Sequence, residues 1–209
     1  MADPTAALVA ELAEVGKDAV GRGLVLASGG NLSARVPGAE TFVVTATGTW
    51  LDRLVPDDFT LMDLDGNVVG GNPKPSSEWK LHQRTYRVRP DVNALIHLHP
   101  QAAVVLDALG YAVRLLTLDH AYYLKRVERI PFFHNGSDEL ADASAEASRD
   151  CNAIILAHHG CSALGDTISM AYRRALNLEE AAANTFRCIQ LGDLITTFPE
   201  DAFKVIHHL

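Results

Sequence analysis

Apolar positions along the chain follow two different periods, and these periods predict both helices and strands. Over residues 5–20, apolar side chains recur every three or four positions, as on one face of a helix, and glycines then end the segment. Residues 24–36 are rich in glycine, serine and asparagine and predict a tight loop that leads into a strand. The β-branched and aromatic run 41–47 predicts a strand, and Asp65-Gly66 between two apolar runs predicts a hairpin.

The rest of the chain predicts further elements of both kinds. A helix is expected from near Ser76 to Arg87, because Pro90 then stops it. Apolar runs predict strands at 94–100, 113–119 and 152–160, and helical spacing predicts helices at 101–109, 137–149 and 166–191 and in the tail. Strands and helices therefore interleave, with hairpins among them. This order predicts a single α/β domain over residues 1–209, with a mixed or largely antiparallel sheet covered by helices.

Composition and charge narrow the possible classes of function. The 209 residues are 48% hydrophobic and 21% charged, which is typical of a folded globular domain. Since 18 Lys and Arg stand against 26 Asp and Glu, the net charge is −8, which argues against proteins that bind nucleic acid or anionic membranes, because both need a basic surface. Three cysteines without a C-x-x-C pair, and an N-terminus without a basic leader or a long apolar run, favour a cytoplasmic protein.

Histidine is frequent, and four of the nine histidines occupy suggestive positions. His97 and His99 lie two residues apart in one predicted strand, and because side chains alternate along a strand, their imidazoles project from the same face. His158 and His159 close another predicted strand. If the two strand ends converge at one edge of the sheet, three imidazoles could hold a divalent ion and leave one position open for substrate. The alternative is that each pair is a hydrogen-bonded strand end without a ligand.

Three short segments have the chemistry of an anion site. Residues 28–33 form a glycine-rich loop, residues 47–49 form a second such turn, and Ser76-Ser77 stand where a helix is expected to begin. Glycine lets backbone N–H groups approach an anion, and the first turn of a helix offers free N–H groups. Glu78 is expected in the first turn of that helix, where it would be either a proton-transfer group or a surface acid that complements the helix dipole. Ordinary turns and a serine cap are the alternatives for the other segments.

Five motifs stand along the chain in a fixed order and spacing: SGGNLS at 28–33, ATG at 46–48, KPSSE at 74–78, HLHP at 97–100 and AHHG at 157–160. In these motifs the chain resembles the class II aldolase/adducin-head family, and the resemblance covers about residue 5 to 195. It implies a three-layer αβα sandwich around a mostly antiparallel sheet. It also implies a homotetramer with active sites at the interfaces between subunits.

The resemblance also implies roles for individual residues. The divalent-metal ligands would be His97, His99 and His159, with zinc the usual metal and manganese, cobalt or nickel as alternatives. Glu78 resembles the acid/base carboxylate. The phosphate-binding residues would be Gly30, Asn31, Thr47, Gly48, Ser76 and Ser77. A second proton-transfer group is expected after the H-x-H strand, where Tyr122 and Tyr123 are the candidates and His120 is an alternative.

The reaction that the resemblance implies is the cleavage of a ketose 1-phosphate, such as L-fuculose 1-phosphate, to dihydroxyacetone phosphate and an aldehyde. A metal ion acting as a Lewis acid would stabilise the enediolate, and Glu78 would protonate it. The alternatives within the family are a 3-oxo-tetronate 4-phosphate decarboxylase and a sugar-phosphate epimerase or dehydratase. Outside it stand a non-catalytic adducin-type scaffold and a cupin-type oxygenase. The oxygenase is disfavoured because it needs a glutamate shortly after H-x-H, where the nearest acid is Asp107.

Overall fold

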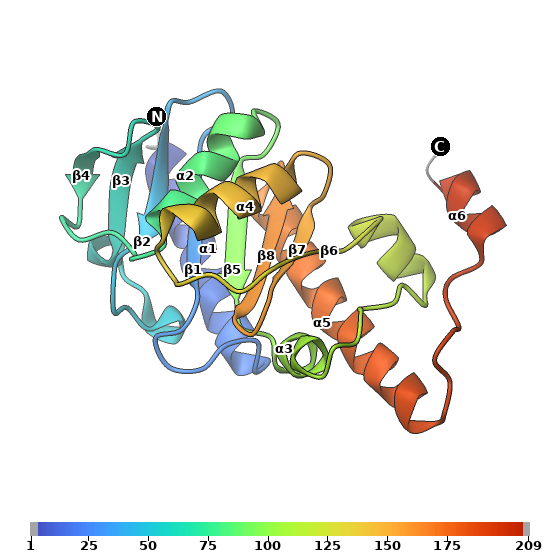
Figure 1. Ribbon diagram of the computed structural model, residues 1–209. Coiled ribbons are helices and arrows are strands. Elements are labelled where there is room, and N and C mark those ends of the chain that lie inside the picture. Colours follow the sequence, from blue (N-terminus) through green and yellow to red (C-terminus); the bar gives the residue numbers. More distant parts are fainter. Residues whose placement is uncertain (1–3, 207–209) are drawn as a thin grey trace.

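A computed structural model describes residues 4–206, and its centre is an eight-stranded sheet (Figure 1). The strands are β1 (Asn31–Ala34), β2 (Thr41–Thr45), β3 (Phe59–Asp63), β4 (Val68–Gly71), β5 (Ala94–Leu98), β6 (Glu128–Ile130), β7 (Ala153–Leu156) and β8 (Gly160–Gly165). Their order across the sheet is β4-β3-β2-β1-β5-β8-β7-β6. Neighbouring strands are antiparallel except β6 and β7, so the prediction of a largely antiparallel sheet is confirmed.

Helices cover both faces of the sheet and complete a three-layer αβα sandwich. The helices are α1 (Pro4–Gly21), α2 (Trp79–Val88), α3 (Gln101–Ala108), α4 (Asp138–Ser148), α5 (Ile168–Gln190) and α6 (Glu200–Ile206), with short turns at Leu51–Arg53 and Pro56–Asp58 and a π-helical turn at His120–Leu124. Helices α2 and α4 pack together over one face, and α1, α3 and α5 lie over the other (Figure 1). The fold class expected from the sequence is therefore confirmed.

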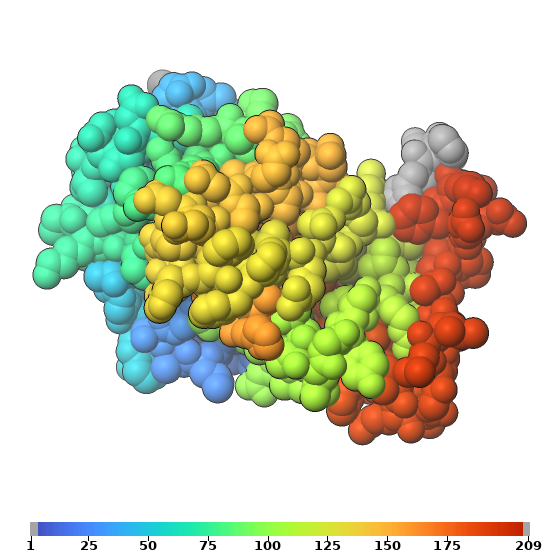
Figure 2. Space-filling model, viewed as in Figure 1, coloured from blue at the N-terminus to red at the C-terminus, as the bar shows by residue number. Residues whose placement is uncertain are grey.

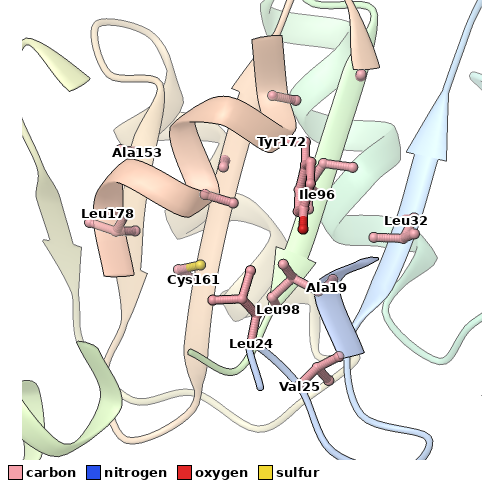
Figure 3. Packing of buried hydrophobic residues seen from close by; sticks show 14 of the residues in the cluster. Ala19, Leu24, Val25, Leu32, Ile96, Leu98, Ala153, Cys161, Tyr172 and Leu178 are labelled. Carbon is pink, nitrogen blue, oxygen red and sulfur yellow. The ribbon is translucent and has the colours of Figure 1, made fainter. Parts of the chain in front are cut away.

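Alternation along β5 divides the hydrophobic core between the two faces. Leu95 packs with Leu81 and Tyr86 of α2, whereas Ile96 and Leu98 pack with the helices of the opposite face. In Figure 3, Ile96 and Leu98 lie among side chains from α1, β8 and α5. Because His97 is two residues after Leu95, the same alternation directs it to the α2 face of the sheet.

Three expected elements differ in the structure. Residues 113–119 do not pair as a strand, because their backbone bonds elsewhere: the Arg114 N–H donates to Thr185 Oγ1 on α5, and the Leu115 carbonyl accepts from Phe198 in the C-terminal segment. The expected strand 152–160 ends early, at Leu156, because the chain turns sharply at residues 157–159. It then runs back as β8, which pairs with β7 in a hairpin.

The helix expected from Ser76 begins only at Trp79, so Glu78 precedes the helix instead of lying in its first turn. The reason is a bond to the sheet. The Ser76 N–H donates to the Thr45 carbonyl, and Pro75 bridges to Ala46, so the backbone here is still tied to the end of β2.

The C-terminal segment lies along one side of the molecule. It follows α5 and ends in α6, which contacts the π-helical turn at His120–Leu124. In Figure 2 this segment, in red, borders the yellow-green part of the chain to which that turn belongs. Among residues 4–206, no helix has both the length and the apolar character needed to cross a membrane.

Candidate active site

Three histidines converge where β5 and β8 lie side by side. His97 is in β5, His99 follows it, and His159 lies in the turn that precedes β8. One ring nitrogen from each lies within 4.8 Å of the others, and the ring centroids are 4.9 to 5.1 Å apart. The structure thus brings the three predicted metal ligands together, whereas His158 is exposed and is not part of the group.

Hydrogen bonding orients the innermost of these histidines. His97 is fully buried, and its Nδ1–H donates to the Cys161 carbonyl at 2.9 Å. That bond leaves the lone pair of Nε2 free to face the centre of the group, where His99 Nε2 lies 3.1 Å away. Three nitrogen donors that face one point and leave one side open fit a zinc-like divalent ion that also binds substrate.

Glu78 lies beside the histidines at the end of the segment that precedes α2. Its Oε2 is 3.2 Å from His97 Nε2 and accepts from Asn31 Nδ2 at 2.9 Å. Its Oε1 is buried, is 3.5 Å from His159 Nε2, and has no hydrogen-bond partner among the described residues. Burying a carboxylate oxygen without a partner costs free energy. A metal ion or a substrate hydroxyl bound next to Oε1 would supply the missing partner.

The ionisation states of these groups suit a metal centre. Burial, reinforced by the neighbouring His97, lowers the pKa of His99 to about 3 and that of His159 to about 4, so both are neutral near pH 7. Burial alone would raise the pKa of Glu78, but His97, His159 and the Asn31 amide outweigh it and hold the pKa well below its usual range. Burial likewise opposes a charge on His97, but Glu78 prevails and raises its pKa. A bound cation would take the place of that proton.

A cavity of about 330 Å³ opens beside this group and holds the predicted anion site. It is lined by three loops and by the histidines: Ser28, Gly29, Gly30, Asn31, Ala46, Thr47, Gly48, Thr49, Ser76, Ser77, Glu78, His99, Asn135 and His159. All six residues predicted to bind phosphate are among them. At Gly30, φ is +70°, and a Cβ would lie 2.7 Å from the His97 carbonyl, so glycine is required for the loop to approach the histidines.

Asn135 lines the cavity but was not a predicted site residue. Asn135 and Gly136 lie in the turn that precedes α4. The turn packs so closely on the serine loop that a Cβ at Gly136 would lie 2.5 Å from the Ser77 carbonyl. The sequence signal for this contact is the glycine, because the geometry of a turn alone does not require contact with a distant loop.

A buried acid, Asp107, and a half-buried acid, Glu179, hold the backbone around the histidines in place. Asp107 of α3 accepts from the backbone N–H of His158 at 2.9 Å and pairs with Arg129. Glu179 of α5 accepts from the N–H groups of Ala102 and Ala103 at 2.8 and 2.9 Å, where α3 begins just after His99. Both carboxylates thus support the chain next to a candidate ligand, as outer-shell groups do at metal sites.

The substitution His158→Asn tests which histidine of the pair is a ligand. His158 has φ of +55°, a conformation that asparagine tolerates better than most residues, and its side chain is exposed. We expect the metal content and kcat/KM to stay within about twofold, and the free energy of unfolding to change by no more than about 0.5 kcal/mol. Metal analysis and denaturant unfolding measure this, and loss of the ion would instead identify His158 as a ligand.

The predicted tyrosines lie outside the cavity. Tyr122 is exposed, and its ring stacks edge-on against that of Tyr123, whose hydroxyl accepts from Arg173. His120, the alternative, is buried with its Nε2 3.5 Å from Glu180. Among the described residues of one chain, none of these three side chains lines the cavity beside the metal-ligand group.

Comparison with known proteins gives the family. The model of the class II aldolase and adducin N-terminal domain matches residues 10–186, so the chain belongs to this family. The L-fuculose phosphate aldolase of Methanocaldococcus jannaschii is 40% identical over 164 residues, which cover 78% of this chain and 87% of the relative. The chain is thus an enzyme of the class II aldolase type.

Two further comparisons extend over nearly the whole chain. The 5-deoxy-D-ribulose 1-phosphate aldolase of Bacillus thuringiensis is 32% identical over 194 residues, which cover 93% of this chain and 91% of the relative. A solved structure of an L-fuculose 1-phosphate aldolase superimposes with a TM-score of 0.89 at 28% identity, and the match covers 100% of this chain and 97% of the other. The relatives are aldolases that act on phosphorylated sugars, as their names state.

Proposed function

We propose that this enzyme is a divalent-metal-dependent aldolase that cleaves a ketose 1-phosphate, such as L-fuculose 1-phosphate, to dihydroxyacetone phosphate and an aldehyde. The observation that carries the proposal is a group of three imidazoles next to an ionised carboxylate and a cavity lined with glycine and serine, whose wall includes two of the imidazoles and the carboxylate. His97, His99 and His159 would hold the ion, for which zinc is our first choice. When bound, the ion supplies Lewis-acid stabilisation of negative charge on the substrate oxygens.

The loops of the cavity bind and orient the phosphate end of the substrate in this proposal. Backbone N–H groups at Gly30 and Gly48 and the side chains of Thr47, Ser76 and Ser77 offer hydrogen-bond donors. Neutral donors of this kind bind a phosphate without a basic surface, so the net charge of −8 is no obstacle. Fixing the phosphate places the carbon chain of the ketose against Glu78 and the histidines.

Glu78 moves the proton at carbon. In cleavage, the C3–C4 bond breaks, its electron pair stays on C3, and C4 becomes the aldehyde carbon as its hydroxyl loses a proton. C3 must then gain a proton, and protonated Glu78 gives it; in the reverse direction, ionised Glu78 removes it. The low pKa that His97 and His159 impose on Glu78 favours the ionised form, which acts in the reverse direction.

A second group must take the hydroxyl proton at C4, and Tyr122 and Tyr123 stay our candidates. Neither lines the cavity of its own chain. In this proposal the enzyme is a homotetramer with active sites at the interfaces, and a tyrosine reaches each cavity from a neighbouring subunit. We also place the enzyme in the cytoplasm, because Cys151, Cys161 and Cys188 are all free.

Release of dihydroxyacetone phosphate tests the proposal. The metal-loaded enzyme is incubated with a panel of ketose 1-phosphates, with and without a chelator, and the product is measured with a coupled dehydrogenase. We expect cleavage of at least one substrate, lost with the chelator and restored by zinc. A 3-oxo-tetronate 4-phosphate is the control: release of CO₂ from it, without cleavage of any ketose 1-phosphate, would refute the aldolase assignment in favour of a decarboxylase.

A further inference from the structure

A continuous chain of buried hydrogen bonds leads from the interior of the protein to Glu78. Tyr86 Oη and Ser33 Oγ lie 2.6 Å apart, Ser33 Oγ lies 2.6 Å from His82 Nδ1, and His82 Nε2 contacts Asn31 Oδ1. Asn31 Nδ2 then donates to Glu78. None of the five side chains belongs to a residue that is more than 5% exposed, and His82 and Ser33 are fully buried.

The orientation of the Asn31 amide fixes the direction of every bond in this chain. Its Nδ2 faces Glu78 and its Oδ1 faces His82, and an amide oxygen only accepts hydrogen bonds. His82 Nε2 must therefore carry a hydrogen. Burial lowers the pKa of His82 to about 3, so the ring is neutral and Nδ1 is a bare acceptor. Ser33 then donates to Nδ1, and Tyr86, whose pKa burial raises, donates to Ser33.

We propose that His82 is a positioning residue that holds the Asn31 amide in the one orientation in which its NH₂ group serves both Glu78 and the substrate phosphate. The NH₂ group has two hydrogens. One bonds to Glu78 Oε2. Because Asn31 also lines the cavity, the second would serve the anion site in this proposal. Rotated by half a turn, the amide would turn its oxygen toward the carboxylate and the phosphate and repel both.

This inference rests on the proposed function for the roles of Glu78 and the phosphate site. The chain of hydrogen bonds itself does not depend on that function. His82 contacts neither the cavity nor Glu78 and acts only through Asn31. It lies in α2, whose first residue directly follows Glu78. The same helix thus places the carboxylate at its N-terminus and, one turn later, the ring that orients the carboxylate's partner.

Substitutions at His82 test the inference with a matched pair and a control. His82→Gln keeps a donor near the position of Nε2, whereas His82→Leu removes it. We expect His82→Leu to lower kcat/KM by about 10- to 100-fold and to weaken the binding of inorganic phosphate, measured by calorimetric titration, by about tenfold, with the metal content unchanged. His82→Gln should restore both to within about threefold of the wild type.

Thr85→Val is the control for a general loss of stability. Thr85 lies in the same helix and is 1% exposed, and its hydroxyl donates to the Leu81 carbonyl, outside the chain of hydrogen bonds. It should lose stability with unchanged kinetics and phosphate binding. If His82→Leu keeps wild-type phosphate binding and kcat/KM, or if His82→Gln fails to restore them, the inference is wrong.

The wild-type protein offers a second test that does not depend on any variant. Nitrogen-15 NMR of labelled histidine distinguishes the two tautomers of a neutral ring, and we expect His82 to carry its hydrogen on Nε2 and to stay neutral from pH 6 to 8. A ring protonated only on Nδ1, or an imidazolium at pH 7, would overturn the inference. Absence of aldolase activity in the wild type would refute the proposed function alone, because the tautomer and phosphate binding are measured without turnover.

Discussion

The substitution His159→Ala is expected to remove the metal ion and to lower kcat/KM by about three orders of magnitude. His159 supplies one of three nitrogen donors within 4.8 Å of one another, and the two that remain, His97 and His99, hold an ion far more weakly than three. Loss of the Lewis acid removes several kcal/mol of transition-state stabilisation, and about 1.4 kcal/mol corresponds to a factor of ten in rate. Metal analysis after gel filtration and steady-state kinetics measure both effects.

The adjacent His158→Asn variant is the matched control for this experiment, because it changes the same turn without touching the group of three. Added zinc is expected to restore little activity to His159→Ala at concentrations that saturate the wild type. Retention of one ion per chain together with normal turnover in His159→Ala would contradict the assignment of this residue as a ligand.

The second large effect is expected at Glu78. Glu78→Gln should keep the metal ion and lower kcat by about 10²- to 10⁴-fold, the usual contribution of a general acid or base. The amide has the shape of the carboxylate, and its oxygen can still accept from Asn31, but it cannot give or take the proton at C3. Rapid-quench or steady-state measurement of product release gives kcat, and metal analysis is done on the same sample.

Two outcomes would contradict the role of Glu78. Full activity of Glu78→Gln would show that another group transfers the proton. Loss of the ion would show that Glu78 is itself a ligand. The metal content is worth measuring because Oε1 has no hydrogen-bond partner among the described residues and lies 3.5 Å from His159 Nε2. A circular dichroism melt of the variant separates either result from misfolding.

Part of the group of His97, His99 and His159 could be predicted from the sequence, because the alternation of side chains along a strand applies to two of the three. The alternation of side chains along β5 is enough to place His97 and His99 on one face. No such rule chooses between His158 and His159, since both were expected at a strand end and the choice rested on the family resemblance. The sharp turn at residues 157–159, with its positive φ at His158, directs His158 outward and His159 inward.

The remaining features depend on contacts between distant parts of the chain. The bond between Asn31 and His82 joins residues 51 positions apart, and Glu179 supports the start of α3 from 76 and 77 positions away. Hydrophobic periodicity carries no information about such pairs. The same limit explains the error at residues 113–119, where an apolar run typical of a strand lies against α5 and the C-terminal segment.

The make-up of the cavity wall indicates which part of a substrate it can contact. The described residues that line the cavity are glycine, alanine, serine, threonine, asparagine, histidine and glutamate, without a large apolar side chain. In the proposed reaction, such a wall would bind the phosphate and hydroxyl groups of the substrate and would make few apolar contacts with the alkyl group at the aldehyde end. Selection among aldehydes would then depend on residues outside this wall, so substrate range could diverge in evolution while the proposed phosphate- and metal-binding residues stay the same.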